Sequence, residues 1–400
     1  MAATPFDIPS LLKKVSTNGS NLSGNEEARR QCLAAARSLC YALETPRESV
    51  LRLHYAELAH QAAIRFGIDL NLFKTLEDGK GKPLHTTELA KRTGADPQLL
   101  ARFLKHLGAM GTIYEVDADL FLPTPLSTAL TDPIYADGFP VLQEVVDPPV
   151  YRLHEFLQET KYQNPDNAYD CPFQLGHNTK KHYFQWMNEH PKLWSMFNSH
   201  MTGTHAGLSS WTAKQYFPLE ERLLKGASET PEEVFFIDVG GGNGHDIQEM
   251  CQRYPHINKR MILQDQASVI DELGDTKLDA RIQPMSHNFF QEQPIKGARA
   301  YYMHRVLHDW PDSKCLEILS HLKSAMTPGY SKLLLYEMVI PDRGAQGNST
   351  GLDLVMMSLF AASERTEGGW HSLLGEAGFK ITKIWPIEPA SESLIEVELA

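Results

Sequence analysis

The sequence predicts a doubly wound α/β domain that follows an all-α, winged-helix domain. The segment Val234–His245 has the pattern of a buried strand, a glycine turn and a helix start, and strand and helix patterns alternate from there to the C-terminus. A helix–turn–helix–hairpin pattern precedes it. We expect an N-terminal dimerisation domain over 1–135, a helical linker and substrate-pocket region over 136–230, and a catalytic domain over 231–400.

The first domain begins with polar helical sequence. Residues 1–50 have helical character, interrupted by a Ser/Asn/Gly-rich break at Ser16–Asn25, and residues 51–78 repeat apolar side chains at helical spacing. Thr86 or Thr87 is expected to cap the next helix, and Gly94 is expected to end it.

The second helix of the winged-helix pattern follows at once. Asp96 is expected to cap it, with Pro97 at its first position. Its apolar face is Leu99, Leu100, Phe103, Leu104 and Leu107. Residues Gly111–Leu122 then alternate like a small hairpin that turns near Asp117–Asp119.

A winged helix raises the possibility of DNA binding, which the charge argues against. The formal net charge is −12, and the second helix offers only Arg102, Lys105 and His106 as cations. Groove binding needs a denser positive surface than this. We therefore expect no nucleic-acid partner, and we expect the domain to form a homodimer through helix packing.

Aromatic and methionine side chains are frequent between residues 183 and 201. Most are expected to form the core between helices, and a minority to line an apolar substrate pocket, since such side chains adapt to flat organic ligands. The spacing of Phe184, Met187 and Met201 is compatible with either role.

Seven strands are expected in the catalytic domain. Only Pro386–Ser393 joins the last two, too few residues for a crossover helix, so they should pair antiparallel at one edge. The seven are Val234–Val239, Arg260–Gln264, Arg281–Met285, Ala298–Met303, Lys332–Tyr336, Phe379–Trp385 and Leu394–Leu399.

The glycine turn identifies a class of cofactor. A dinucleotide fingerprint would place its third glycine at 245, where this chain has His245; the third glycine here is Gly244. The pattern Asp238–Gly244 resembles motif I of class I S-adenosylmethionine methyltransferases. Asp265, at the end of the second strand, is expected to accept hydrogen bonds from both ribose hydroxyls, or else to cap a helix.

The ends of the later strands supply further candidates. Asn288 and Phe289 follow the third strand, where they could contact an adenine edge and face, or form a turn with core phenylalanines. His308 follows the fourth strand, and a histidine is suited to removing a hydroxyl proton at neutral pH. Glu337 and Glu364 are the candidate carboxylates that would orient its ring.

Four segments together resemble the plant and fungal O-methyltransferases that combine a winged helix with a Rossmann-like domain, closest to the fungal secondary-metabolism branch. They are Asp238–Gly244, Leu307–Asp312, Glu337–Pro341 and Glu364–Glu367. The resemblance implies S-adenosylmethionine as cofactor, a homodimer, and His308 as general base between two glutamates. It also implies cofactor contacts from the residues at Gly240, Gly241, Gly242 and Asp265, and acceptor contacts from Met356, Met357 and Phe360.

Two positions depart from this family pattern. The family commonly has aspartate at Asn288 and lysine or arginine at His304, so both residues, each expected near the cofactor, could change its affinity. The expected function is methylation of a hydroxyl on a small aromatic or polycyclic metabolite. The alternative is dehydration or pericyclic chemistry beside S-adenosylmethionine without methyl transfer.

Location and metal content follow from the remaining composition. Five cysteines without close pairing indicate reduced thiols, no apolar run reaches 18 residues, and the N-terminus lacks a signal-peptide pattern. We expect a cytoplasmic protein with no membrane partner and no metal.

Overall fold

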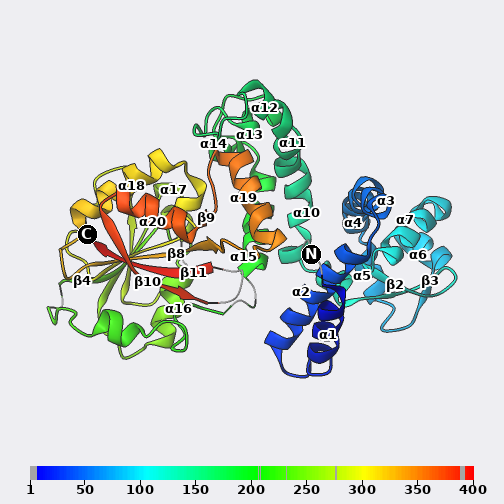
Figure 1. Ribbon diagram of the computed structural model, residues 1–400, viewed down its shortest axis with the longest axis horizontal. Coiled ribbons are helices and arrows are strands. Elements are labelled where there is room, and N and C mark those ends of the chain that lie inside the picture. The colour runs from blue at the N-terminus through cyan, green and yellow to red at the C-terminus, as the bar shows by residue number, and fades with distance from the viewer. Residues whose placement is uncertain (1–6, 206, 208, 231, 275–276, 388–391) are drawn as a thin grey trace. The chain divides into compact units, whose positions relative to one another are not determined.

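The computed structural model describes residues 7–205, 207, 209–230, 232–274, 277–387 and 392–400 (Figure 1). The chain forms two compact units, Met1–Phe139 and Pro140–Ala400. The segment 136–230, expected as a linker and pocket region, belongs almost entirely to the second unit, together with the sheet.

The first unit is mainly helical. The helix break that the sequence predicted at Ser16–Asn25 begins later in the structure, because α1 continues to Gly19. Asn25 caps α2 by accepting a hydrogen bond from the Ala28 N–H. A π-helical turn, η1 (Arg52–Glu57), joins α3 to α4. The helices are α1 (Ile8–Gly19), α2 (Glu26–Leu43), α3 (Pro46–Leu51), α4 (Leu58–Asp69), α5 (Leu72–Glu77), α6 (Thr86–Thr93), α7 (Pro97–Ala109), α8 (Pro125–Ala129) and α9 (Pro133–Ala136).

The winged-helix prediction is confirmed, with one cap corrected. Three short strands, β1 (Leu84–His85), β2 (Ile113–Asp117) and β3 (Leu120–Pro123), form a sheet in the order β1-β3-β2. Helix α6 is capped by His85, whose ring accepts from the Thr87 N–H, because the backbone is still extended at His85 and Thr86 is already helical.

Helix α7 begins and packs as the sequence indicates, except at one position. The Asp96 carboxylate accepts from the Leu99 N–H at 2.8 Å, and Pro97 takes the first helical position. Leu100, Leu104 and Leu107 are fully buried, whereas Leu99 is 41% exposed. Leu99 therefore lies outside the apolar face to which the periodicity assigned it.

The second unit opens with helices and short turns. Asn178, in the left-handed conformation, ends α13. The elements are α10 (Gly138–Val141), which crosses the boundary of the units, η2 (Leu142–Val146), α11 (Asp147–Tyr151), α12 (Leu153–Glu159), α13 (Pro172–His177), α14 (Tyr183–Asn188), α15 (Pro191–His205) and η3 (Glu220–Leu224).

The large sheet has the order β10-β11-β8-β7-β4-β5-β6. The central strands are parallel, and β10 and β11 pair antiparallel at one edge, as predicted. A two-residue strand, β9 (Arg365–Thr366), pairs parallel with the end of β8. The main strands are β4 (Val234–Val239), β5 (Arg260–Asp265), β6 (Ile282–Ser286), β7 (Ala300–His304), β8 (Lys332–Ile340), β10 (Phe379–Pro386) and β11 (Glu392–Leu399).

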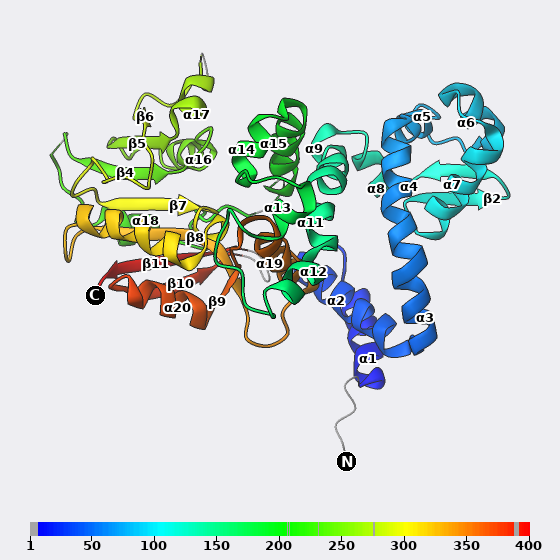
Figure 2. The same ribbon diagram turned by 90° about the horizontal axis from the view of Figure 1, so that it is seen from above.

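Helices cover both faces of this sheet, which confirms the doubly wound α/β fold. Apolar residues of α18 (Asp312–Ala325) and α20 (Glu367–Glu376) form one core layer, and those of α16 (His245–Arg253) and α17 (Ala267–Glu272) form the other. Figure 2 shows α16 and α17 on one side of the strands and α20 on the other. Among the described residues, no helix has both the length and the apolar content needed to cross a bilayer.

Candidate active site

The parallel strands bring the predicted residues to one edge of the sheet. Gly240 follows β4, Asp265 ends β5, His304 ends β7, and Glu337 lies near the end of β8. Because neighbouring parallel strands end at the same edge, residues nearly 100 positions apart become neighbours, as expected for a ligand site in an open α/β sheet.

The turn after β4 requires its glycines for two reasons. Gly240, Gly242 and Gly244 have φ values of 75°, 56° and 75°, in the left-handed region that side chains disfavour. At Gly241 the obstacle is space, since a Cβ there would lie 2.4 Å from Asp238 Cγ and 2.5 Å from Leu263 Cδ1. The backbone can therefore approach a ligand closely.

Asp265 lies against this turn. Its Oδ2 accepts from the Gly242 N–H at 2.8 Å, and its Oδ1 accepts from the Gln266 N–H at 2.7 Å. Burial raises the pKa of Asp265, while these two N–H groups oppose the shift. Each carboxylate oxygen has a second lone pair, so the side chain can accept two further hydrogen bonds.

Phe289 lies beside the glycine turn, and Asn288 shapes the loop before it. A Cβ on Gly240 would be 3.8 Å from Phe289 Cε1, and the Phe289 ring lies 6.1 Å from that of Trp310. The Asn288 Oδ1 accepts from the Phe290 N–H at 3.0 Å, and the residue is exposed. Its amide nitrogen remains the group that can donate to a ligand.

His304 is paired with an acid that the sequence reasoning did not select. Asp246, in the first turn of α16, accepts from His304 Nδ1 at 2.7 Å and from the Tyr302 hydroxyl at 2.6 Å. Burial opposes protonation of His304, but Asp246 and Glu392 outweigh it and raise its pKa to about 10. The histidine is therefore a cation, like the lysine or arginine common at this position in the family it resembles.

A buried histidine–glutamate pair joins His308, on the short 3₁₀ turn η4 (Leu307–Asp309), to Glu364, the residue before β9. His308 Nδ1 and Glu364 Oε1 are 2.7 Å apart, and both side chains are buried. His308 Nε2 lies 3.4 Å from Asp309 Oδ1. Burial opposes the charge on His308, but Asp309, Glu364 and Glu337 outweigh it and raise its pKa to about 9. Asp309, adjacent in sequence to His308, was not selected as a site residue.

Glu337 has a different position from Glu364. Its Oε1 accepts from the backbone N–H groups of Val306, at 3.1 Å, and Leu307, at 2.9 Å, so it holds the turn that carries His308. Burial raises the pKa of Glu337 to about 7, although the charge on His308 opposes the shift. Glu337 thus acts on His308 through the backbone and through its charge, with no hydrogen bond to the ring.

Arg365 ties the two parts of the pair together. It follows Glu364 directly, and its guanidinium donates to the carbonyl oxygens of Leu307, at 3.2 Å, and Trp310, at 3.4 Å. It also donates to the Asp312 carboxylate at 2.6 Å. The motif Glu-Arg-Thr contained this residue, but the motif alone did not indicate that it reaches the turn of His308.

An aromatic cluster lies next to this turn. Phe184, Met187, Met356 and Phe360 contribute to one core formed by α11, α13, α14, α15 and α19 (Gly347–Phe360). The Phe184 and Phe360 rings are 5.5 Å apart, and the Phe184 ring is 6.5 Å from Trp310. Met201, on α15, and Met357, on α19, are half-buried.

The fold and site define an α/β enzyme with a nucleoside-cofactor turn and a buried histidine–glutamate pair beside it. The family model described as an O-methyltransferase domain matches residues 220–380. "Methyltransferase cfoC" of Aspergillus candidus is 37% identical over 398 residues, covering 99% of this chain and 97% of the relative. The chain belongs to the O-methyltransferase family of fungal secondary metabolism and is an S-adenosylmethionine-dependent enzyme.

Solved structures resemble the whole chain. One titled "A Pericyclic Reaction enzyme" has a TM-score of 0.87 and 29% identity, covering 98% of this chain and 99% of its own. The structure of LepI in complex with S-adenosylmethionine has a TM-score of 0.88 and 29% identity, covering 98% and 100%. The same fold therefore accompanies more than one kind of chemistry, and the residues of the site have to separate them.

Proposed function

We propose that the protein methylates a hydroxyl group of a small aromatic or polycyclic metabolite and that His308 removes the hydroxyl proton. The observation that carries this proposal is the 2.7 Å hydrogen bond between His308 Nδ1 and Glu364, both buried. Because the carboxylate engages Nδ1, Nε2 is the nitrogen that takes up the proton, and Glu364 stabilises the resulting imidazolium.

The residues at the strand ends fit the cofactor. The bare backbone of Gly240, Gly241 and Gly242 lets an amino-acid or nucleoside group approach closely, and Asp265 keeps lone pairs for ribose hydroxyls. Phe289 offers an aromatic face beside the turn, and Asn288 an amide N–H. His304 supplies a positive charge that suits a carboxylate.

The charge of His308 has to change before it can act as a base. With a pKa of about 9 it is an imidazolium at neutral pH, surrounded by three carboxylates. Bound S-adenosylmethionine supplies the methyl group from a positively charged sulfonium, and a nearby positive charge lowers the pKa of an imidazolium. His308 is then neutral at a physiological pH and able to accept a proton.

The aromatic cluster supports a flat acceptor. Phe184, Met187, Met356 and Phe360 present apolar surface next to Trp310, two residues beyond His308. Together with Met201 and Met357, they are the proposed acceptor contacts. Incubating the enzyme and S-adenosylmethionine with a metabolite extract that lacks its product tests the proposal: a product heavier by one methyl group supports it.

A second candidate function has two observations in its favour. His308 is an acid, not a base, at its pKa of about 9, and a pericyclic-reaction enzyme matches the fold over 98% of this chain. In a dehydration, His308 would donate its proton to a hydroxyl group that leaves as water, and the neutral imidazole would take up the proton that the neighbouring carbon loses as the double bond forms. A product that has lost water, or an isomer of the acceptor, would favour this function over methyl transfer.

The first unit is proposed to form the homodimer. Large apolar side chains are exposed along its first helices, namely Leu12, Leu22, Leu33, Tyr41, Leu43, Val50, Leu53, Tyr55 and Leu58. By contrast, Lys105 on α7 is ion-paired with Glu115 and Asp119, each at 3.4 Å. The surface of the first unit is therefore better suited to pack against the apolar surface of a second copy of the chain than to bind a phosphate backbone.

A further inference from the structure

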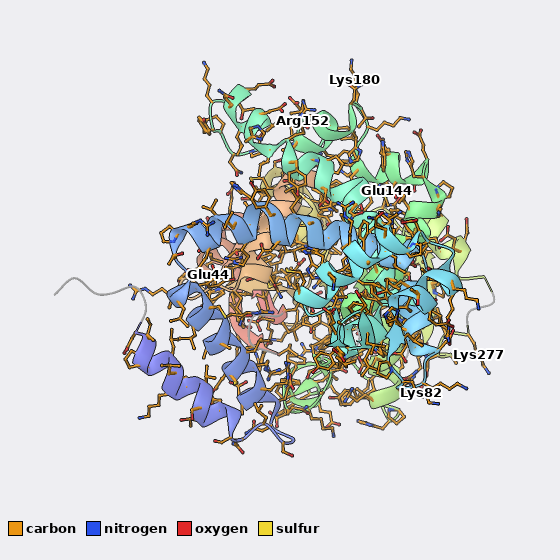
Figure 3. The ribbon with its side chains drawn as sticks, turned by 90° about the vertical axis from the view of Figure 1, so that its right-hand side faces the viewer. Glu44, Lys82, Glu144, Arg152, Lys180 and Lys277 are labelled. Carbon is orange, nitrogen blue, oxygen red and sulfur yellow. The ribbon has the colours of Figure 1, made fainter. Side chains whose placement is uncertain are left out.

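His182 is a buried histidine that the proposed chemistry does not use. It immediately precedes α14 and is only 4% exposed. Its Nε2 has no hydrogen-bond partner among the residues that the structure describes. Lys180, two residues earlier, is exposed and projects outward, as Figure 3 shows. A buried polar atom without a partner costs free energy, so its retention calls for a reason.

The tautomer of His182 follows from its role as a helix cap. Its Nδ1 accepts a hydrogen bond from the Phe184 N–H at 3.3 Å, so Nδ1 carries a lone pair. In a neutral imidazole the proton is then on Nε2. Burial lowers the pKa of His182 to about 4, which keeps the ring neutral at physiological pH. The unpartnered atom is therefore a hydrogen-bond donor.

The ring is held in one orientation. The Gln185 side chain accepts from the His182 N–H at 3.2 Å, and Gln174 donates to the carbonyl oxygen of Lys181 at 2.9 Å. The imidazole stacks on Trp310 with centroids 5.4 Å apart and planes 13° apart, and lies 6.2 Å from the Phe360 ring. Trp310 ends the turn that carries His308, so the donor belongs to the surroundings of the proposed acceptor.

We propose that the Nε2–H of His182 donates a hydrogen bond to an oxygen of the acceptor molecule, so that the enzyme selects flat aromatic substrates bearing a carbonyl or ether oxygen besides the reactive hydroxyl. The inference rests on the proposed function, because it takes the acceptor to lie beside His308. A site built with one donor discriminates strongly against an analogue that leaves this donor unpaired.

Two probes that differ by one carbonyl oxygen test the donor. The full-length protein is titrated with 6-acetyl-2-naphthol and with 6-ethyl-2-naphthol, and binding is followed by tryptophan fluorescence. The wild type should bind the acetyl probe about tenfold more tightly. His182→Met keeps a weak acceptor, its sulfur, for the Phe184 N–H but has no N–H donor, and should bind both probes equally. His182→Phe, which keeps a stacked ring, should do the same.

His177→Met is the matched control. His177 also lies in the aromatic cluster, with its ring 4.6 Å from the Trp186 ring and tilted by 43° to it, but its Nε2 is already paired with the Val145 carbonyl oxygen at 2.8 Å. This variant should keep the preference for the acetyl probe. A wild type without the preference, or a folded His182 variant that retains it, overturns the inference.

A measurement without any variant completes the test. In protein labelled with ¹⁵N-histidine, the acetyl probe should move one imidazole N–H signal downfield, and the ethyl probe should leave it in place; equal responses overturn the inference. Methylation of either probe by S-adenosylmethionine is scored separately. A binding preference without methylation would count against the proposed function and leave the role of His182 supported.

Discussion

In most folded proteins, charged side chains are exposed and apolar side chains are buried. The site in the second unit departs from this rule in one way, and the first helices of the N-terminal unit depart from it in the opposite way. In the site, charged groups such as His308, Glu337 and Glu364 are buried. Along α1 to α4, apolar groups such as Leu53, Tyr55 and Leu58 are exposed. Each arrangement costs free energy in the isolated chain, and each becomes favourable once something else is bound.

The two regions therefore need different kinds of partner. Buried charges that face one another call for a ligand or a proton transfer, since burial amplifies their interaction. The exposed apolar surface on α1 to α4 is suited to pack against another apolar surface, which we propose belongs to a second copy of the chain.

The largest effect is expected from removing the proposed base. His308→Ala should lower kcat by roughly 10²–10⁴-fold, because the acceptor hydroxyl keeps its proton. Binding of S-adenosylmethionine, measured by calorimetry, should persist. His371→Ala, on the exposed side of α20, serves as the control and should retain full turnover. Full turnover by His308→Ala would contradict the proposed role of His308 as the base.

Replacing the glutamate that orients the base should have the next largest effect. Glu364→Gln loses the carboxylate that holds His308 Nδ1, and kcat should fall by about 10²-fold. The pH at which kcat is half-maximal should also move down, since a neighbouring negative charge that raised the pKa of His308 is gone. Glu367→Gln changes the same motif at an exposed position and should alter neither quantity.

Breaking the exposed apolar surface should change assembly and leave folding intact. The double variant Leu53→Asp, Leu58→Asp should weaken the dimer by about 10²-fold, measured by sedimentation at several concentrations. Both side chains are more than half exposed, so the unfolding free energy of the monomer should change by less than about 1 kcal/mol. A wild type that is monomeric at every concentration contradicts the proposed homodimer.

The smallest effect is a dependence of stability on pH that runs against activity. The folded-state pKa of His308, about 9, is above its ordinary value, so its contribution to stability is full below about 6.5 and is lost as pH rises through 9. The difference in unfolding free energy between wild type and His308→Gln should therefore shrink from pH 6.5 to 9.5. Turnover should rise with pH, but at lower pH values, below neutral pH, because the bound cofactor lowers the pKa of His308.

Much of the fold could be predicted from local sequence, because each strand of the sheet is an apolar run with a recognisable end. Strand ends then indicated Gly240, Asp265 and His308. The partners of these residues were harder to predict. Glu364 reaches His308 across 56 positions only because β9 pairs with the end of β8. Glu337 was expected to flank the ring, and instead accepts two backbone N–H groups, a detail of the turn geometry.

Two single polar residues, His182 and Asp246, gave no signal in the sequence. His182 and Asp246 stand in segments whose pattern indicates ordinary helices, and their roles depend on neighbours from distant parts of the chain. Which partners a buried polar side chain has thus depends on tertiary packing, and the periodicity of the sequence does not indicate it.

Arg365 fixes the proposed catalytic pair to the turn η4. Its guanidinium donates to two carbonyl oxygens of the turn that carries His308, and its backbone continues directly from Glu364. One residue therefore helps to set the distance between His308 and Glu364. Met356 and Phe360 belong to α19, and so does Asp353, whose carboxylate accepts from the Glu364 N–H at 2.9 Å. We therefore expect substitutions at Met356 and Phe360 to change which acceptor binds, and substitutions at Asp353 to displace Glu364 from His308.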